Sequence, residues 1–473
     1  MRVLILNPPV PRGSLTNRDL MGGMGINDDF GTSVSSRFVA FLKNQGTRMP
    51  VMTLGYAAAL LAPHVDVEVL DLGHEASGPE TLARAAAVKP EWIVAATSFA
   101  YLGTELKFLS ELHARTGAKR LLVGQTATHY AKEILERGLA EFIASGDPEV
   151  AVSELAKGAK ELGERVRERF LNVDALPFPD WSKFPRDDYA YFPLLKKKPF
   201  LPVLSSRGCP YGCSFCPYPV AQGAPFRGRS AKNVVDELQH LIERYGVQSV
   251  LFRDPTFTLD LDRAADICRL ILERGLKLEF GIETRLDRME SGLIELLGRA
   301  GCTSVEFGVD PLEQETLLAN HRRPLAPKKV HDVVKALEAN GMRTAGLAVL
   351  GLPEQSLDEM KRTIEWVDEL GLSYINYELA TPFPGTALYE EAVNKGWARP
   401  IQFDELLEGD PKLTFNGKVD VAATRALQDE ALRRFYVRPS RVAKEVLSGS
   451  MLDSARFFAQ SGLRFLGRAR SRQ

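Results

Sequence analysis

The sequence predicts an α/β protein with an N-terminal doubly wound, Rossmann-like parallel sheet, a second series of strand–helix units forming a partial (β/α)6-type barrel, and a helical C-terminal tail. Short apolar strand segments alternate with helical segments over the first 150 residues, and the alternation resumes from residue 201 to about residue 395. Strands that alternate with helices are typical of parallel sheets. A helical pattern from residue 422 onward predicts the tail.

The N-terminal sheet is predicted from five strands, at residues 3–6, 65–71, 92–98, 120–124 and 141–145. Helical segments separate them at 53–61, 79–88, 102–116 and 131–138. The segment 92–98 (WIVAATS) is almost entirely apolar, as expected for a strand in a sheet covered by helices on both faces. Doubly wound sheets bind ligands beyond the carboxyl ends of their strands. We therefore expect a ligand site at this edge of the sheet.

Two segments do not fit this alternation. Residues 13–47 form a long, glycine-rich polar stretch, which is either a mobile surface loop or a loop that covers a ligand. Residues 170–200 are rich in proline and aromatic residues without a period. Free tethers are poor in aromatic residues, so this stretch is predicted to be a linker packed along a surface.

The second series predicts a partial or full barrel with function at the strand carboxyl ends. Its strands are expected at 203–205, 249–252, 277–281, 304–309, 344–350 and 374–379. The intervening helices are expected at 230–245, 262–274, 292–300, 327–340 and 357–370.

Composition excludes several classes of protein. The chain has 473 residues with 60 Lys and Arg against 61 Asp and Glu, which does not favour a nucleic-acid-binding protein. It has no run of about 18 uncharged apolar residues, as a membrane span needs, and its N-terminus does not resemble a signal peptide. A cytoplasmic location is therefore predicted. Residues 431–473 hold ten Lys and Arg but only two Asp and Glu, which predicts either a helix docked on the protein or peripheral membrane contact.

The cysteines carry the strongest functional signal. The chain has five, at these positions: Cys209, Cys213, Cys216, Cys268 and Cys302. The first three follow the first strand of the second series with C-x3-C-x2-C spacing. Zinc sites normally need four ligands, and a redox pair would leave one cysteine over. Three thiolates can hold three irons of a 4Fe–4S cluster and leave the fourth iron open. Cys268 and Cys302 are predicted to be packing residues.

This triad, with Phe215 before its last cysteine, resembles the radical S-adenosylmethionine (SAM) superfamily. The resemblance implies that the open iron binds SAM and that an electron from the cluster cleaves SAM to a 5′-deoxyadenosyl radical. The residues that it implies near SAM follow the strands: Phe215, Asp254, Thr284, Arg285 and Asp310. Relatives more often have Glu where this chain has Asp310.

The N-terminal half resembles the cobalamin-binding domain fused to one large class of radical enzymes. The resemblance implies cobalamin contacts at the strand ends: Asn7, Pro8, Pro9, Ser98, Gly124, Gln125, Thr126, Gly146, Asp147 and Glu149. The Asp-x-His-x-x-Gly motif that supplies a histidine to cobalt is absent after the first strand. His74 has the wrong spacing for it and is predicted to be a surface histidine, so cobalt is expected to lack a histidine ligand below.

The resemblance implies a cobalamin-binding domain at residues 1–165, a linker at 166–200, a radical SAM core at 201–395 and a helical region at 396–473. The predicted activity is methylation of an unactivated carbon by a cobalamin-dependent radical SAM methyltransferase. The alternatives are a ring-forming or ring-rearranging enzyme of the anaerobic porphyrin cyclase type and a non-catalytic cobalamin or SAM sensor. Expected partners are a small-molecule substrate, which the basic aromatic tail weakly suggests is hydrophobic, and a reductase, ferredoxin or flavodoxin as electron donor.

Overall fold

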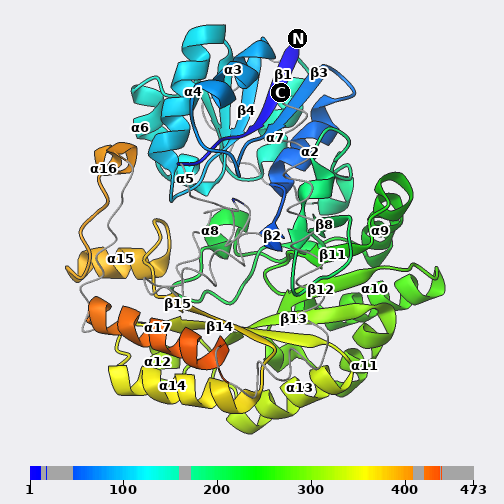
Figure 1. Ribbon diagram of the computed structural model, residues 1–473, viewed down its shortest axis with the longest axis vertical. Coiled ribbons are helices and arrows are strands. Elements are labelled where there is room, and N and C mark those ends of the chain that lie inside the picture. Colours follow the sequence, from blue (N-terminus) through cyan, green and yellow to red (C-terminus); the bar gives the residue numbers. More distant parts are fainter. Residues whose placement is uncertain (12–17, 19–45, 159–171, 409–419, 437, 439–473) are drawn as a thin grey trace.

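The computed structural model describes residues 1–11, 18, 46–158, 172–408, 420–436 and 438. Two parallel sheets form the body of the protein, with the N-terminal sheet above the second sheet in the view of Figure 1. Most of the predicted loop at 13–47 and the tail beyond residue 438 lie outside the described residues.

The N-terminal sheet has five parallel strands in the order β3-β1-β4-β5-β6. The strands are β1 (Arg2–Asn7), β3 (Asp66–Asp71), β4 (Trp92–Ala96), β5 (Lys119–Val123) and β6 (Phe142–Ala144). The helices that accompany them are α2 (Met52–Leu61), α3 (Pro79–Ala87), α4 (Leu102–Thr116), α5 (Gln125–His129), α6 (Ala131–Glu136) and α7 (Pro148–Ala156). The strand order reverses between β1 and β4, where doubly wound sheets form their ligand crevice. This confirms the predicted architecture of the N-terminal half.

The second sheet has six parallel strands whose spatial order follows the chain, β8-β11-β12-β13-β14-β15. They are β8 (Phe200–Val203), β11 (Ser249–Phe252), β12 (Glu279–Thr284), β13 (Cys302–Val309), β14 (Arg343–Leu350) and β15 (Tyr374–Leu379). The connecting helices are α9 (Ala231–Tyr245), α10 (Leu261–Glu273), α11 (Ser291–Ala300), α12 (Gln314–Ala319), α13 (Pro327–Ala339) and α14 (Leu357–Leu370). The two end strands do not pair, so this is a partial barrel, as predicted.

The third strand of this barrel differs from its predicted position. It begins at Glu279 and continues to Thr284, whereas the apolar pattern predicted residues 277–281. Lys277 is exposed and stays outside the sheet, while Glu283 and Thr284 pair with β13. The strand therefore extends three residues beyond its predicted end, into polar residues that the apolar pattern did not include.

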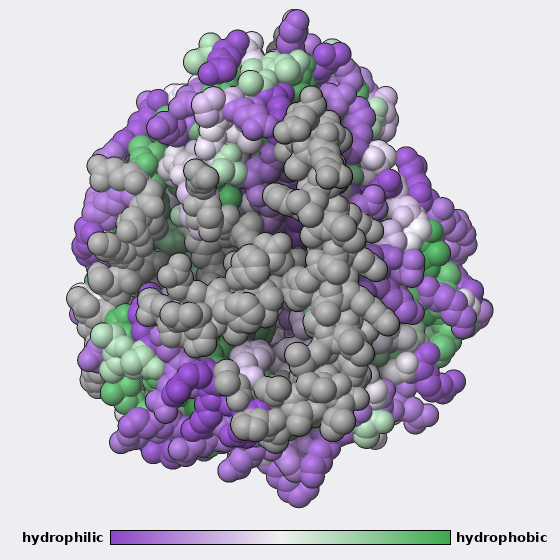
Figure 2. Space-filling model, viewed as in Figure 1, coloured by the Kyte–Doolittle hydropathy of each residue, from purple (hydrophilic) through white to green (hydrophobic). Residues whose placement is uncertain are grey.

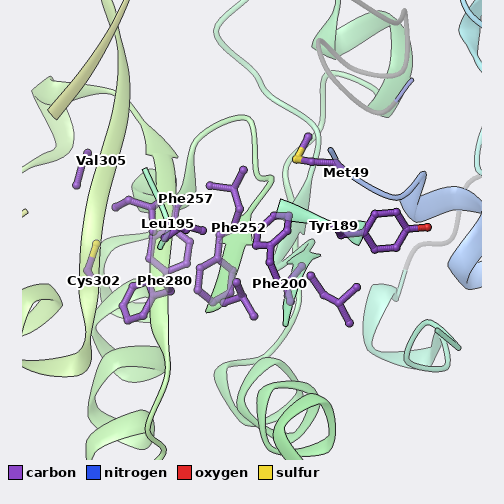
Figure 3. Packing of buried hydrophobic residues seen from close by; sticks show 14 of the residues in the cluster. Met49, Tyr189, Leu195, Phe200, Phe252, Phe257, Phe280, Cys302 and Val305 are labelled. Atoms are coloured by element: carbon purple, nitrogen blue, oxygen red, sulfur yellow. The ribbon is translucent and has the colours of Figure 1, made fainter. Parts of the chain in front are cut away.

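One hydrophobic core joins the two sheets. It includes Val3 of β1 and Val250 of β11 in the same cluster of buried side chains. Figure 3 shows Tyr189, Phe200, Phe252 and Phe280 lying in succession across this core, with Phe252 and Phe280 packed edge to face at 5.7 Å. Because the core is continuous, the two sheets form one body.

The linker is packed between the sheets, as its aromatic residues predicted. It contains η2 (Val173–Ala175), η3 (Arg186–Asp188) and β7 (Ala190–Tyr191), which pairs with β2 (Thr47–Arg48). Trp181 is fully buried against α2, where a Cβ at Gly55 would lie 2.5 Å from the indole ring. Tyr191 donates from its hydroxyl to Glu306 of β13 over 2.9 Å. The linker thus contacts both sheets.

The C-terminal helices close two sides of the molecule. They are α15 (Ala387–Asn394), α16 (Phe403–Glu408) and α17 (Val421–Tyr436). The α16 helix returns to the N-terminal domain, where the backbone of Leu406 passes Gly103 of α4 too closely for any Cβ. The α17 helix packs on β15 and α14.

No helix in the described part of the chain is both long and apolar enough to cross a membrane. The described atoms on the face shown in Figure 2 are mostly hydrophilic. The basic segment at residues 439–473, where membrane contact was one of two predictions, lies outside the described residues.

Candidate active site

The carboxyl edges of the two sheets meet at a shared cavity of about 770 Å3, counting the part open to solvent. The lining from the N-terminal half includes Arg18, Val51, Met52, Thr53, Tyr56, Ala96, Thr97, Val123, Gly124, Gln125, Gly146, Asp147, Pro148 and Glu149. The lining from the second half is Leu204, Arg207, Ala221, Gln222 and Arg253. The short helix α8 (Tyr218–Gln222), which follows the cysteine loop, therefore lies between the two halves (Figure 1).

The cysteine loop leaves β8 through a sharp turn. Gly208 has φ +82°, and a Cβ there would lie 2.0 Å from the carbonyl oxygen of Pro225, so only glycine fits. Cys209, Cys213 and Cys216 are all partly exposed. Burial, together with the nearby Cys213 and Cys209 thiols, raises the pKa of the Cys216 thiol to about 12. The three sulfur atoms are thus close enough to interact electrostatically.

Three consecutive residues after α12 hold the middle of this loop. Asn320 accepts from Ser214 twice, at its backbone carbonyl over 3.3 Å and at its side chain over 2.9 Å. The Nδ1 atom of His321 lies 3.2 Å from the carbonyl oxygen of Gly212. Arg322 donates to the sulfur of Cys213 over 3.4 Å. We call residues 320–322 the loop clasp.

The loop fits an iron–sulfur cluster better than a single metal ion. No three His, Cys, Asp or Glu side chains in the described ranges converge in a way that could hold one ion. A cubic cluster takes one thiolate per iron, so its ligands need not converge on one point. The remaining cysteines, Cys268 and Cys302, are buried in the core, as predicted, and lie outside this loop.

Several residues predicted near SAM do lie around the cysteine loop. The Arg285 guanidinium stacks over the ring of Tyr211, which lies between the first two cysteines, at 4.3 Å. Asp310 accepts from Arg322 over 2.8 Å and so contacts the clasp. Arg322 also lies 5.9 Å from the ring of Phe215. These contacts bring the ends of β12 and β13 to the loop.

Asp254 and Thr284 are used differently. Asp254 is fully buried, and its carboxylate accepts from the backbone N–H of Ser205 over 2.7 Å and from the hydroxyl of Ser206 over 2.8 Å. It therefore holds the end of β8 just before the cysteine loop. The Thr284 hydroxyl pairs with that of Thr258 at 2.5 Å. A contact of either side chain with SAM stays a prediction.

A polar cluster links the loop to the cavity. Arg253, which lines the cavity, forms an ion pair with Glu283 of β12. Tyr218, two residues after the last cysteine of the triad, donates to Glu283 over 3.1 Å and accepts from Arg253 over 3.1 Å. The pKa of Tyr218 is raised, chiefly by burial. No pattern in the sequence predicted this cluster.

At the N-terminal edge, the predicted residues Asn7 and Ser98 are turned away from the cavity. Asn7 donates to Asp71 over 2.6 Å, and Ser98 donates through its backbone to Glu105 over 2.8 Å. Arg18 joins the two, since it contacts Asn7 and donates to Glu105 over 2.8 Å. All five side chains are buried. Pro8, Pro9 and Thr126 are also buried and do not line the cavity.

Asp147 and Glu149 do line the cavity, but both form ion pairs with arginines of the second half. Arg207, two residues before Cys209, donates to Glu149 over 2.6 Å and to Asp147 over 3.2 Å. Arg227 also pairs with Asp147. The pKa of Arg207 is raised because these two carboxylates stabilise its charge against burial. Sequence reasoning missed Arg207, although it stands beside the cysteine motif.

The remaining predicted residues face the cavity mainly through backbone and small atoms. Gly124 has φ +115°, and a Cβ there would lie 3.1 Å from the hydroxyl of Thr97. Gly146 also has a positive φ, of +85°. Gln125 donates to the carbonyl oxygen of Ala221 in α8 over 2.8 Å. The turns after β5 and β6 thus present glycines and backbone atoms to the cavity.

His74, predicted to be a surface histidine, is partly exposed just after β3. Its Nε2 atom is buried and has no hydrogen-bond partner among the described residues. Burial lowers its pKa to about 3, with the charge of Arg48 adding to the effect. The reason is tertiary: β3 ends against the linker, where Tyr189 donates to Asp71 over 2.6 Å. No histidine lines the described part of the cavity.

Comparison with known proteins agrees with this geometry. Residues 203–367 match the Radical SAM superfamily. An uncharacterized methyltransferase of Pyrococcus horikoshii is 29% identical over 61% of this chain and 62% of its own length. Cytidylyl-2-hydroxyethylphosphonate methyltransferase of Streptomyces wedmorensis is 28% identical over 48% and 45%. Anaerobic magnesium-protoporphyrin IX monomethyl ester cyclase of Rubrivivax gelatinosus is 26% identical over 46% and 39%. The chain spans less than two thirds of the length of these curated relatives.

Two solved structures have the same overall fold. The radical SAM methyltransferase TsrM of Kitasatospora setae, with tryptophan and a SAM analogue bound, matches with a TM-score of 0.63 at 19% identity, over 84% of this chain and 77% of TsrM. The cobalamin-dependent SAM radical enzyme OxsB, with aqua-cobalamin bound, matches with a TM-score of 0.63 at 14% identity, over 97% of this chain and 72% of OxsB.

The chain therefore carries a radical SAM domain, and its fold as a whole is that of the cobalamin-dependent radical SAM enzymes. The relatives to which the chain is similar in sequence include two methyltransferases and a porphyrin cyclase.

Proposed function

We propose that this protein is a cobalamin-dependent radical SAM methyltransferase that methylates an unactivated carbon of a small molecule. The observation that carries the proposal is the shared cavity: residues after β5 and β6 of the N-terminal sheet line it together with Arg207, two residues before the cysteine triad. A cobalamin on the N-terminal edge and a cluster in the cysteine loop would then lie on adjacent walls of one site. Methyl transfer through both cofactors needs this proximity.

Each cofactor has a distinct set of residues to hold it. Cys209, Cys213 and Cys216 hold the cluster, and Arg285, Asp310 and Phe215 lie around the position of SAM. When bound, the cluster and SAM supply the radical, and cobalamin supplies the methyl group. The chain itself contributes the turn at Gly208, the buried support from Asp254 and the polar cluster of Arg253, Glu283 and Tyr218 between the two cofactors.

Cobalamin would rest on the turns at Gly124, Gln125 and Gly146, without a histidine ligand below cobalt. Support for this position comes from the place of these three residues in the lining of the cavity. The corresponding units are the cobalamin-binding domain at 1–165, the linker at 166–200, the radical SAM core at 201–395 and the helical region at 396–473. Asp147 and Glu149 would contact cobalamin while they also form ion pairs with Arg207.

The cyclase alternative shares this layout, because a porphyrin cyclase is among the relatives. Methylation is favoured by the methyltransferases among the relatives and by the fold match to TsrM. The sensor alternative does not explain why three thiols stand on one loop that turns sharply at Gly208. Electrons would come from a reductase, ferredoxin or flavodoxin. Peripheral membrane contact, if the tail has that role, would involve residues 439–473.

The experiment uses anaerobically reconstituted protein with SAM carrying a labelled methyl group and candidate small molecules. We expect 5′-deoxyadenosine and S-adenosylhomocysteine to form together and label to enter the product. Product formation without label would identify a cyclase. SAM cleavage that continues unchanged after removal of all cobalamin would contradict the proposal.

A further inference from the structure

The segment between α12 and α13 has two features that the proposed catalysis does not use. Its first part, the loop clasp at residues 320–322, binds the cysteine loop at Gly212, Cys213 and Ser214. Its next part, residues 323–329, is exposed except for Leu325. The same short stretch therefore touches the cysteine loop and continues onto the protein surface.

This surface is basic. Between Glu315 and Asp332 the chain has four Lys and Arg, two His and no Asp or Glu. Arg322 is paired with Asp310 and Lys328 with Asp332. Arg323 and Lys329 are exposed and form no ion pair within the described residues. Exposed charges of one sign attract a partner of the opposite sign and speed its association.

An exposed apolar residue lies next to the loop clasp. Leu318, at the end of α12, is 56% exposed, more than any other large hydrophobic residue in the described ranges. Its carbonyl oxygen accepts from the backbone N–H of His321 over 3.1 Å, so it is adjacent to the clasp. An exposed apolar residue with charged residues around it is typical of an interface with an apolar centre and a polar rim.

We propose that Leu318, His321, Arg323 and Lys329 form the docking surface for an acidic electron-transfer protein that reduces the cluster. Electron transfer slows steeply with distance, so the donor must dock near the cysteine loop. Here the exposed His321 contacts Gly212, which is itself exposed, so the donor would reach the loop without opening the cofactor cavity. Complexes of this kind are small and transient, which suits a patch of four side chains.

The proposal rests on the proposed function only in requiring the cluster. The test is therefore the rate of cluster reduction in reconstituted enzyme, followed by absorbance after mixing with a reduced bacterial flavodoxin. Dithionite, which needs no docking surface, serves as the second reductant. A protein that assembles no cluster refutes the proposed function, whereas a cluster that dithionite reduces normally allows the docking surface to be judged separately.

The main variant is Arg323→Glu with Lys329→Glu. We expect flavodoxin to reduce it about tenfold more slowly than the wild type at low salt, with dithionite reduction unchanged. High salt should slow the wild type and leave the variant little altered, since screening removes the same attraction. The matched control is Lys277→Glu with Arg299→Glu, which makes the same charge change on exposed residues at the opposite end of the barrel.

A second variant, Leu318→Ser, tests the apolar centre without altering charge. We expect it to weaken flavodoxin binding and to keep the salt dependence of the wild type. Three results would overturn the proposal: equal slowing with both reductants, equal slowing in the control, or a flavodoxin rate that neither Arg323→Glu with Lys329→Glu nor Leu318→Ser changes.

Discussion

The two edges that face the cavity differ in what they leave for a ligand. On the N-terminal edge, the polar side chains are already bonded to one another: Asn7 to Asp71, Ser98 to Glu105, and Glu149 to Arg207. Glycine turns and backbone remain. On the other edge, the three cysteines stand together on one partly exposed loop, and Arg322 donates a hydrogen bond to the sulfur of Cys213. The first edge is suited to hold a ligand by shape, and the second by specific donor atoms.

The largest effect on cofactor binding is expected at the cysteine edge, where specific donor atoms hold the ligand. Replacing Cys213 by Ala removes one of three cluster ligands, so the iron content of reconstituted protein should fall from about four atoms per chain to background. SAM cleavage should be lost with it. The control is Cys268→Ala, a buried thiol in α10, which should cost on the order of 1 kcal/mol of stability and keep the iron. Retention of a full cluster by Cys213→Ala would mean that the loop holds its metal differently.

The next effect concerns the ion pairs that join the two edges. Arg207→Met leaves Asp147 and Glu149 buried with less countercharge, so the free energy of unfolding should fall by about 3–5 kcal/mol. Urea denaturation measures it. The control is Arg137→Met. This variant breaks a solvent-exposed ion pair between the N-terminal half and Asp404 of α16. Such a pair contributes at most about 1 kcal/mol. Equal losses of unfolding free energy in both variants would show that the buried ion pairs contribute no more to stability than the exposed one.

A smaller effect on cofactor binding is expected at the N-terminal edge, where the shape of the turns holds the ligand. Gly124→Ala puts a Cβ at a positive φ beside Thr97, which strains the turn by about 1–3 kcal/mol. We expect cobalamin affinity to fall about tenfold, which corresponds to about 1.4 kcal/mol, as measured by equilibrium dialysis. Gly117→Ala is the control, because Gly117 also has a positive φ but ends α4 with open space around it. If both variants bind cobalamin like the wild type, the turn after β5 does not contact cobalamin.

The smallest effect tests the hydrogen bond that the sulfur of Cys213 accepts from Arg322. An N–H donor stabilises the reduced cluster, which carries more negative charge, so Arg322→Met should lower the reduction potential. A loss of about 1 kcal/mol corresponds to a shift of about 40 mV for one electron. Redox titration monitored by electron paramagnetic resonance measures this shift. Arg362→Met, which removes an exposed pair with Glu313, is the control. A shift of equal size in the control would assign the effect to surface charge.

The sequence by itself determined the elements and the chemistry carried by local spacing. Apolar periodicity predicted both parallel sheets, because burial of a strand or helix face imposes a regular spacing on the residues that form it. The C-x3-C-x2-C spacing likewise singled out one loop. The bounds of individual strands were predicted less accurately: β8 begins at Phe200, three residues before its predicted start, and β12 begins at Glu279, two residues after its predicted start.

Only the tertiary structure decided which polar side chains remain free for a ligand. Asn7 and Ser98 stand at strand ends, as predicted, but Arg18 and Glu105 take up their hydrogen bonds. Arg322 reaches Cys213 from 109 positions away in the chain. The linker packs on the end of β3, and the Nε2 atom of the nearby His74 is buried. In each case the partner comes from a distant segment, and local spacing carries no information about which distant segments will meet.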